Sequence, residues 1–503
     1  MNLGYEHLIQ ELGGLRVAGP ITPCKIDRRV QAIVAGERGL LAPPTMEIAR
    51  HDLMGHAEFA LKHQGVHLEA MQAICAKLDP ALVQKALNDN PNGKYVRQIA
   101  YLFEAFTGVE LDSRVTATAY TKLFDEDKYV TGENRRSAKF RVNQNGFGPL
   151  EYCPIIRRTE TLKRLMMRDL FADLAEFVER VGGARNLDRA LGWAYLSETK
   201  GSFEIEGEKV SQDKAQRFVQ LLHRAHHAED LTQEYLAELQ SSTITNPFHQ
   251  EGGYRNRQNW LSRGGRQYAG GVTYVPPHPQ KAHELMAHLE AFANAPYPSN
   301  SREALLKSLV ISFGFVFIHP FMDGNGRISR FLTHHGLCRA KLLEEGLILP
   351  LSVAFKQHEG DYLRCLESVS LPIKRMWQIN YVDEDAIDAT YRGDGDPWRF
   401  WDATAPVEFG MSMAHFALDH TLVDEMDFLE KFDRAYACID RAYDVVNKDL
   451  VNLIRMTVDE GRLSKNRRKQ YAHSVPEHVL DAIEVIVRME FFGDDDGEGG
   501  NHS

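Results

Sequence analysis

The segment that most constrains the fold is an almost uncharged apolar run from Ala304 to Phe317 (ALLKSLVISFGFVF). Its apolar residues recur on every side of a helical wheel rather than in one stripe. Such a helix cannot lie on the surface, because it would expose apolar side chains to water. We therefore predict a core helix, capped by Ser301, that is buried on most of its faces.

A short polar stretch from Ile318 to Arg330 (IHPFMDGNGRISR) follows this helix directly. Gly324 and Gly326 can take left-handed backbone angles at little cost, so the N–H groups around Asn325 can converge into an anion-binding nest. The next helix is expected to begin near Gly326 or Arg327, which aims its positive N-terminal end at the same place. The stretch therefore predicts a site for phosphate oxygens.

Individual side chains of this stretch have the chemistry that a phosphate site needs. Asp323 is a hard oxygen ligand for Mg²⁺, which usually binds through one or two carboxylates plus substrate phosphates. Arg327 and Arg330 lie on one helix face and can each donate two N–H groups to phosphate oxygens. His319 is the candidate general base because its unperturbed pKa is near neutrality. Phe321 is expected to face inward and anchor the turn.

On spacing alone, a structural interpretation competes with the catalytic one. An isolated Asp-Gly-Asn-Gly sequence is usually a tight turn, and a lone histidine before a proline is more often structural than catalytic. The whole string, however, resembles the signature of the Fic family, His-Pro-Phe-x-(Asp/Glu)-Gly-Asn-Gly-Arg-x-x-Arg, and fills every fixed position of it. The resemblance implies an all-helical core and Mg²⁺-dependent transfer of a nucleoside monophosphate, most often AMP from ATP, to a hydroxyl of a target protein.

A second motif lies well before the signature. By itself, the stretch from Ser197 to Glu208 (SETKGSFEIEGE) is an N-capped acidic helix start or a polar turn. Beside the signature, Ser202-x-x-x-Glu206-Gly207 resembles the inhibitory motif of autoinhibited Fic proteins. The resemblance implies that the Glu206 carboxylate pairs with a signature arginine, most plausibly Arg330, and takes the place of the γ-phosphate. Inhibition would then act in cis.

Residues 254–277 have stronger strand character than helix character. Two candidate strands, Arg257 to Leu261 and Gly271 to Val275, flank a turn rich in Gly and Arg (SRGGRQYAG), which predicts a β-hairpin. An ordinary surface hairpin would have the same pattern. The resemblance implies that it is the Fic flap, which lies over the active site and binds the target segment by strand addition.

Tyr362 is the candidate contact to the nucleotide base. The segment from Gly360 to Leu366 resembles a downstream Fic segment with paired tyrosines, but here Leu363 follows Tyr362. The departure leaves the choice of nucleotide open.

Composition restricts the class of protein. The chain has 503 residues, 43% of them hydrophobic, and a formal net charge of −11, which argues against general nucleic-acid binding. No basic segment followed by an apolar one opens the chain, and no uncharged run reaches the ~18 residues of a membrane span. Six scattered cysteines without CxxC spacing indicate reduced thiols. We therefore expect a cytoplasmic protein without membrane or nucleic-acid partners.

The expected fold is mainly α-helical, with a Fic-type core, a small β-hairpin flap and helical extensions at both ends. The predicted division is an N-terminal helical region at 1–165, a Fic core at 180–390, a C-terminal helical region at 400–492 and a disordered acidic tail at 493–503. Within the core we expect an inhibitory helix near 197–210, the flap near 257–277 and the signature at 319–330.

The sequence hypothesis is a protein adenylyltransferase that moves AMP from Mg²⁺-ATP to a Ser, Thr or Tyr hydroxyl of a target bound at the flap, or of the chain itself. Two alternatives stay open: a de-AMPylase or a transferase of another nucleotide or phosphodiester group, and a non-catalytic interaction protein. The expected roles are a catalytic base (His319), a metal ligand (Asp323), nucleotide-binding residues (Phe321, Gly324, Asn325, Gly326, Arg327, Arg330, Tyr362) and inhibitory residues (Ser202, Glu206, Gly207).

Overall fold

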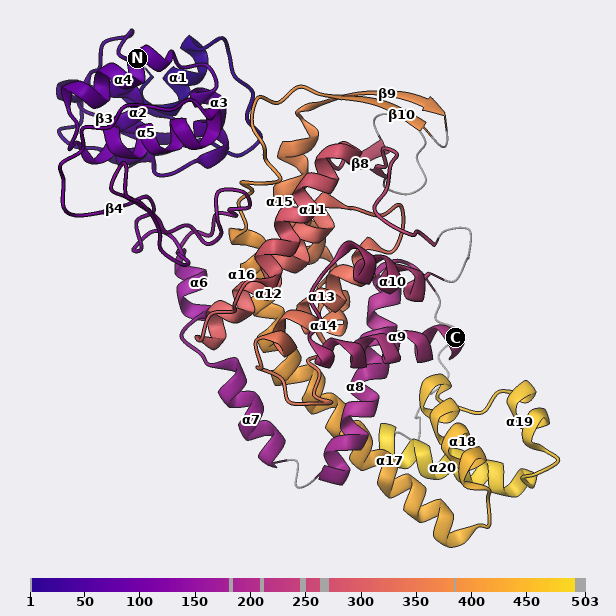
Figure 1. Cartoon of the computed structure of the whole chain (residues 1–503). Helices are drawn as coiled ribbons and strands as arrows, with labels where there is room; N and C mark the ends of the chain where they lie inside the picture. The colour runs from indigo at the N-terminus through magenta and orange to yellow at the C-terminus, as the bar shows by residue number, and fades with distance from the viewer. Residues whose placement is uncertain are drawn as a thin grey trace, which may run out of the picture.

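The computed structural model describes residues 2–180, 184–208, 212–244, 250–262, 271–383 and 386–493. Figure 1 shows three groups of elements: an N-terminal unit, a central helical body and a C-terminal helical unit. Helices predominate, and the strands are short, so the expected mainly helical fold is confirmed. Among the described helices, none combines the length and the apolar composition that a membrane span needs.

The N-terminal unit contains helices and two small three-stranded sheets, and its buried side chains form one large hydrophobic cluster and a smaller one that includes the first sheet. The sheets have the strand orders β1-β3-β2 and β4-β6-β5, each with one parallel and one antiparallel pair. We expected a mainly helical region here. The strands contain only two to four residues each, too few to show an alternating pattern in the sequence. The elements are α1 (Tyr5–Glu11), β1 (Cys24–Ile26), β2 (Val34–Gly36), β3 (Gly39–Ala42), α2 (Leu53–Phe59), α3 (Leu68–Cys75), α4 (Pro80–Asp89), α5 (Lys94–Thr107), β4 (Thr121–Lys122), β5 (Arg135–Ser137) and β6 (Val142–Gln144).

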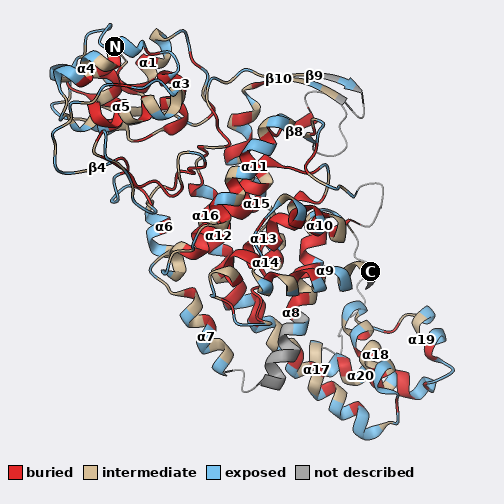
Figure 2. Ribbon diagram, in the orientation of Figure 1, coloured by how far each residue is buried: buried red, intermediate tan, exposed pale blue. Residues whose placement is uncertain are grey.

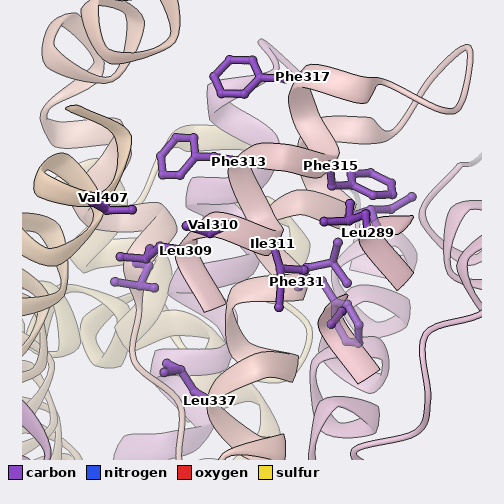
Figure 3. Packing of buried hydrophobic residues seen from close by; sticks show 14 of the residues in the cluster. Leu289, Leu309, Val310, Ile311, Phe313, Phe315, Phe317, Phe331, Leu337 and Val407 are labelled. Carbon is purple, nitrogen blue, oxygen red and sulfur yellow. The ribbon is translucent and has the colours of Figure 1, made fainter. Parts of the chain in front are cut away.

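The central body is built around α12 (Ser301–Ile318), the predicted core helix. In Figure 3, Phe313 and Phe317 point to one side of it and Phe315 to the other, and all three belong to the central hydrophobic cluster. Burial on nearly every face is therefore confirmed, as the red colour of α12 in Figure 2 shows. The cap differs from the prediction: the Asn300 side chain, not that of Ser301, accepts the N–H groups of Arg302 and Glu303.

Helices surround α12 on all sides, and two antiparallel hairpins lie at one end of the body (Figure 1). The β7–β8 hairpin is the expected flap. The β9–β10 hairpin was not expected, although its first strand, WQINYVD, alternates in character. The other elements are α6 (Glu160–Leu165), α7 (Leu170–Arg180), α8 (Ala184–Ile205), α9 (Gln212–Arg224), α10 (Gln233–Thr243), β7 (Leu261–Ser262), β8 (Val272–Tyr274), α11 (Pro279–Asn294), α13 (Asn325–Arg339), α14 (Leu351–Gln357), α15 (Glu359–Lys374), β9 (Trp377–Asp383), β10 (Ala386–Tyr391) and α16 (Thr404–Phe416).

The C-terminal unit has a separate hydrophobic cluster formed by four helices. These are α17 (Leu422–Ala442), α18 (Asn447–Glu460), α19 (Lys465–Tyr471) and α20 (Glu477–Phe492). The preceding helix, α16, packs in the central cluster instead, through residues such as Val407 and Met411. The tail expected to be disordered lies outside the described residues from 494 onward.

Buried histidines outside the signature predict that the fold is sensitive to acid. Burial lowers the pKa values of His56, His67 and His335 to about 4, against ~6.5 in an unfolded chain. Above pH ~6.5 the neutral rings contribute their full stability, and this contribution is lost as the pH falls from ~6.5 towards the folded-state pKa values. We expect the urea midpoint to be clearly lower at about pH 5 than at about pH 7. Equal midpoints would contradict this assignment.

Candidate active site

His319 ends α12 in a left-handed conformation, with φ 53° and ψ 59°. Its Nδ1 lies 3.0 Å from the carbonyl oxygen of Val316. A carbonyl can only accept, so Nδ1 carries the proton and Nε2 keeps a free lone pair. Burial, assisted by the positive charge of Arg255, lowers the pKa of His319 to about 4. The imidazole is therefore neutral at physiological pH and able to accept a proton at Nε2.

Asn325 closes the turn between α12 and α13 with its side chain. Its Oδ1 accepts the N–H of Phe321 at 3.0 Å, and its Nδ2 donates to the carbonyl of the same residue at 2.8 Å. Phe321 is fully buried and packs against Tyr254 and Phe315, as its expected anchoring position requires. Its side chain thus shapes the turn from inside the core.

The two glycines of the signature serve different purposes. Gly324 has φ 85° and precedes α13, as the nest prediction requires. Gly326 instead lies in the first turn of α13, so our expectation that it also favours a left-handed angle is wrong. A methyl group on Gly326 would lie 2.1 Å from Glu206 Oε1 and 3.2 Å from Arg330 Nη1. Glycine is needed there because an anion lies directly against the backbone.

That anion is the Glu206 carboxylate, and it pairs with Arg330 as expected. Arg330 Nη2 donates to Glu206 Oε1 at 2.9 Å and to the Ser202 carbonyl at 2.7 Å, and Nε donates to Ser202 Oγ at 2.8 Å. Although burial acts to raise it, the pKa of Glu206 is lowered by the Arg330 guanidinium. Gly207 follows with φ 72° and turns the chain after α8. Ser202 and Glu206 of the second motif therefore contact the signature, and Gly207 ends the segment that carries them.

Arg327 also binds a carboxylate of this segment, which the sequence did not lead us to expect. Its Nη1 lies 3.0 Å from Glu208 Oε1, and its Nη2 lies 3.1 Å from Asp323 Oδ1. The guanidinium also lies 5.2 Å from the centroid of the Phe203 ring. Glu208 in turn contacts Lys214 of α9 at 3.2 Å. Each signature arginine is thus paired with its own acidic residue from the segment that follows α8.

Both arginines keep a buried nitrogen without a partner among the described residues. These atoms are Arg327 Nε and Arg330 Nη1. Buried hydrogen-bond donors nearly always have an acceptor in proteins. Two buried donors without one, beside a helix N-terminus, are suited to bind the oxygens of a polyphosphate.

Asp323 has the exposure that a Mg²⁺ ligand needs. Its side chain is 46% exposed, and Oδ1 accepts the N–H of Gly324 at 2.6 Å. Within the described ranges, no group of three or more His, Cys, Asp or Glu residues is arranged to hold a metal. One carboxylate suits Mg²⁺ that takes its other ligands from phosphates and water.

Tyr362 lies on α15 in the core. It packs against Phe355, Phe409 and Phe313, and burial raises the pKa of its hydroxyl to about 12, against the effect of the nearby Arg330 charge. The structure therefore places the Tyr362 hydroxyl near the Arg330 guanidinium, and its contact with a nucleotide base stays a prediction.

The flap is fastened to the signature by side chains on the segment before it. The strands β7 and β8 pair antiparallel, with Leu261 opposite Tyr274, so a hairpin forms as predicted, but its first strand is Leu261–Ser262 and not Arg257 to Leu261. Asn259 Nδ2 donates to the carbonyl of Phe321 at 2.9 Å, and the N–H of Met322 donates to Glu251 Oε1 at 2.7 Å. Most of the predicted turn, residues 263–270, lies outside the described residues.

The helix that carries Glu206 is anchored by a buried carboxylate that the sequence analysis missed. Glu198 accepts the backbone N–H of Ser352 at 2.6 Å and also the Ser352 hydroxyl, and it lies 3.2 Å from His334 Nε2. These contacts join α8 to α14 and α13. No local pattern could reveal them, because the partners lie more than a hundred positions away in the chain.

Comparison with known proteins finds similarity to the Fic family in the region of the signature. Residues 230–337 match the model of the Fic/DOC family. Curated relatives include a protein adenylyltransferase Fic of Drosophila willistoni, 41% identical over 73 residues, and one of Aedes aegypti, 35% identical over 105 residues. These alignments cover 14% and 20% of this chain and 14% and 18% of the relatives.

A probable protein adenylyltransferase of Aquifex aeolicus (strain VF5) is 26% identical over 228 residues, which are 41% of this chain and 65% of that protein. The chain thus spans less than two thirds of each of these relatives. The crystal structure of a Fic family protein from Desulfovibrio desulfuricans G20 aligns with 70% of this chain and 100% of its own, at 18% identity and a TM-score of 0.38. The family match encloses the complete signature, and the chain therefore carries a Fic domain.

Proposed function

We propose that the chain is a protein adenylyltransferase that transfers AMP from ATP to a Ser, Thr or Tyr hydroxyl of a target protein. One observation carries the proposal: a neutral histidine with a free Nε2 ends α12, beside two arginines and the N-terminus of α13. A base next to a polyphosphate site suits phosphoryl transfer to a hydroxyl. The names of the relatives support AMP as the transferred group.

In the proposed reaction, His319 Nε2 takes the proton of the target hydroxyl. The hydroxyl oxygen forms a bond to the α-phosphorus of ATP, and the bond from that phosphorus to the oxygen bridging to the β-phosphate breaks. Pyrophosphate leaves, and the target keeps the AMP. Arg327 and Arg330 bind the leaving phosphates, and the N-terminus of α13 faces the charge that develops. Positioning and charge stabilisation provide most of the acceleration.

Asp323 would hold Mg²⁺, and the ion would neutralise negative charge on the phosphates. The target is proposed to bind at the flap by strand addition, and the chain itself is a candidate target. We also propose a cytoplasmic location, which is supported by the six cysteines, all present as free thiols.

We further propose that the enzyme is autoinhibited in cis. The Glu206 carboxylate lies against Gly326 and pairs with Arg330, so it occupies an anion position that a phosphate of ATP needs. Ser202 strengthens the arrangement by accepting two hydrogen bonds from the same guanidinium. ATP must displace this carboxylate before Arg330 can bind the leaving phosphates.

The Glu208→Gln variant is expected to be partly activated. The substitution removes one negative charge from beside Arg327 and leaves the Glu206–Arg330 pair in place. Because Glu208 is about one third exposed, its ion pair contributes only about 0.2–1 kcal/mol. We therefore expect roughly two- to fivefold faster labelling with ATP carrying radioactive α-phosphate. A rate equal to wild type would show that the Glu208 contact does not restrain the site.

Mass spectrometry of a lysate treated with ATP and the Glu206→Gly variant tests the proposed activity. An AMP adduct on target hydroxyls is the expected result. An adduct of a different mass would assign another nucleotide or phosphodiester group to the site. Hydrolysis of an AMP-modified target by wild type, lost in the variant, would support the hydrolase instead. A variant that neither binds Mg²⁺-ATP nor forms adducts would leave the non-catalytic alternative.

A further inference from the structure

Arg255 has a guanidinium whose hydrogen bonds go to backbone carbonyls. The residue is 2% exposed. Its Nε donates to the carbonyl of His319 at 2.8 Å, Nη2 to that of Pro277 at 2.6 Å, and Nη1 to that of Arg257 at 3.0 Å. Its own backbone N–H donates to the carbonyl of Pro320 at 2.8 Å. One side chain therefore joins three separate segments.

Within the described part of the chain, no carboxylate lies within ion-pair distance of this guanidinium. Burial lowers the pKa of Arg255 to about 10, against the weaker effect of charges such as that of Glu251. Burying a cation without a paired anion is unfavourable, so a fold keeps one only where its geometry matters. Lysine could not replace it, because a single ammonium group lacks the planar fork that reaches three acceptors.

The three carbonyls belong to the proposed base and to the two ends of the flap, whose relative positions must be correct for the transfer reaction. His319 is the base, and its left-handed backbone is costly for a residue that is not glycine. Arg257 precedes the first flap strand, and Pro277 follows the second. The Arg255 fork thus holds the base and both ends of the flap in one unit.

We propose that Arg255 is a positioning residue for the transfer reaction, keeping His319 aligned with a target strand on the flap. The inference rests on the proposed function. Arg255 acts through His319 and the flap, because each of its three guanidinium nitrogens already donates to a backbone carbonyl of the protein. Its positive charge also lowers the pKa of the His319 ring. Loss of the charge should therefore change this pKa, whereas loss of the planar hydrogen-bonding group should change the alignment of His319.

Kinetics in the Glu206→Gly background test the positioning role. We expect Arg255→Gln to lower kcat by roughly 100-fold, the effect of a misplacement near 1 Å, with the KM for ATP changed less than about twofold. Arg255→Lys keeps the charge without the fork and should also lower kcat. Arg302→Gln is the matched control, because Arg302 donates to the Arg168 carbonyl at 3.1 Å near the other end of α12. We expect this control to equal its parent.

The pKa of His319, measured by NMR on the full chain with labelled histidine, provides a second readout that does not need activity. We expect Arg255→Gln to raise this pKa, because a neighbouring positive charge is lost, and Arg255→Lys and Arg302→Gln to leave it unchanged. If the Glu206→Gly parent transfers nothing, the proposed function fails, and the NMR titration still decides whether Arg255 acts on His319.

Equal kcat and equal His319 pKa in Arg255→Gln and Arg302→Gln would overturn the inference. So would a loss explained wholly by a smaller folded fraction, with kcat per folded molecule unchanged. Should Arg255→Gln fail to fold, Arg255→Lys decides: a lower kcat per folded molecule supports the positioning role, and an unchanged kcat refutes it.

Discussion

Replacing Glu206 with glycine is expected to raise the rate of AMP transfer by roughly 10- to 100-fold. A hydrogen bond to a charged group contributes about 1.5–3 kcal/mol, and each 1.4 kcal/mol corresponds to a factor of about ten. The substitution frees the N–H of Arg330 Nη2 that Glu206 accepts and vacates the space beside Gly326, so ATP no longer competes with a resident carboxylate. Transfer of radioactive α-phosphate to protein, measured at limiting ATP, gives the rate.

Glu204→Gly is the matched control for this substitution. Glu204 lies in the last turn of α8, two residues before Glu206, and none of the ion pairs that the structure describes involves it. Glycine should weaken the helix end similarly in both variants. Equal rates in the two variants would mean that helix loosening, rather than removal of the Glu206 carboxylate, activates the enzyme. No activation in either would remove the case for autoinhibition.

Replacing His319 in the Glu206→Gly background is expected to lower the transfer rate by roughly 10²- to 10⁴-fold, the usual contribution of a general base. Two substitutions separate the loss of the base from a disturbance of the backbone at this position. Alanine removes the ring, and asparagine tolerates the left-handed backbone better than most residues. Both should show this loss of rate, and the asparagine variant should still bind Mg²⁺-ATP with nearly the parent affinity. An asparagine variant as active as its parent would exclude His319 as the base.

The pH dependence of the parent variant adds a check on the same assignment. The pKa of His319 is about 4, and Glu206 acts to raise it. Removing Glu206 therefore keeps this pKa at or below that value, and His319 stays neutral as the pH rises from about 6. We expect the rate to be nearly independent of pH between about 6 and 8. A tenfold rise per pH unit in this range would assign the limiting ionisation to another group.

The sequence could place the expected site residues together because they are close in the chain. His319, Asp323, Arg327 and Arg330 follow one another across a single helix–turn–helix junction, and helical spacing alone places the two arginines on one face. The contact of Glu206 with Arg330 was reached only through resemblance to a known motif. The predicted hairpin and core helix rest on periodic patterns of local origin.

Other features could not be read from local pattern. The N-terminal sheets have strands too short to show an alternating pattern. The cap of α12 is Asn300 rather than the predicted Ser301, because both are polar residues that can cap a helix and they are adjacent in the sequence. We expected glycine at position 326 because it can adopt left-handed backbone angles. The structure shows a different reason: the Glu206 carboxylate approaches so closely that a side chain would not fit. In that case the residue was predicted correctly but its physical cause was not.

The sequence by itself determined the chemistry of the apolar helix and of the polar stretch that follows it: a base, a carboxylate, a glycine turn and two arginines. Only the tertiary structure decided which groups restrain that chemistry. Glu208 meets Arg327, Glu198 meets Ser352, and Arg255 joins His319 to the flap. These partners are separated by tens of residues or more, so their contacts arise from packing of whole helices, which no local spacing encodes.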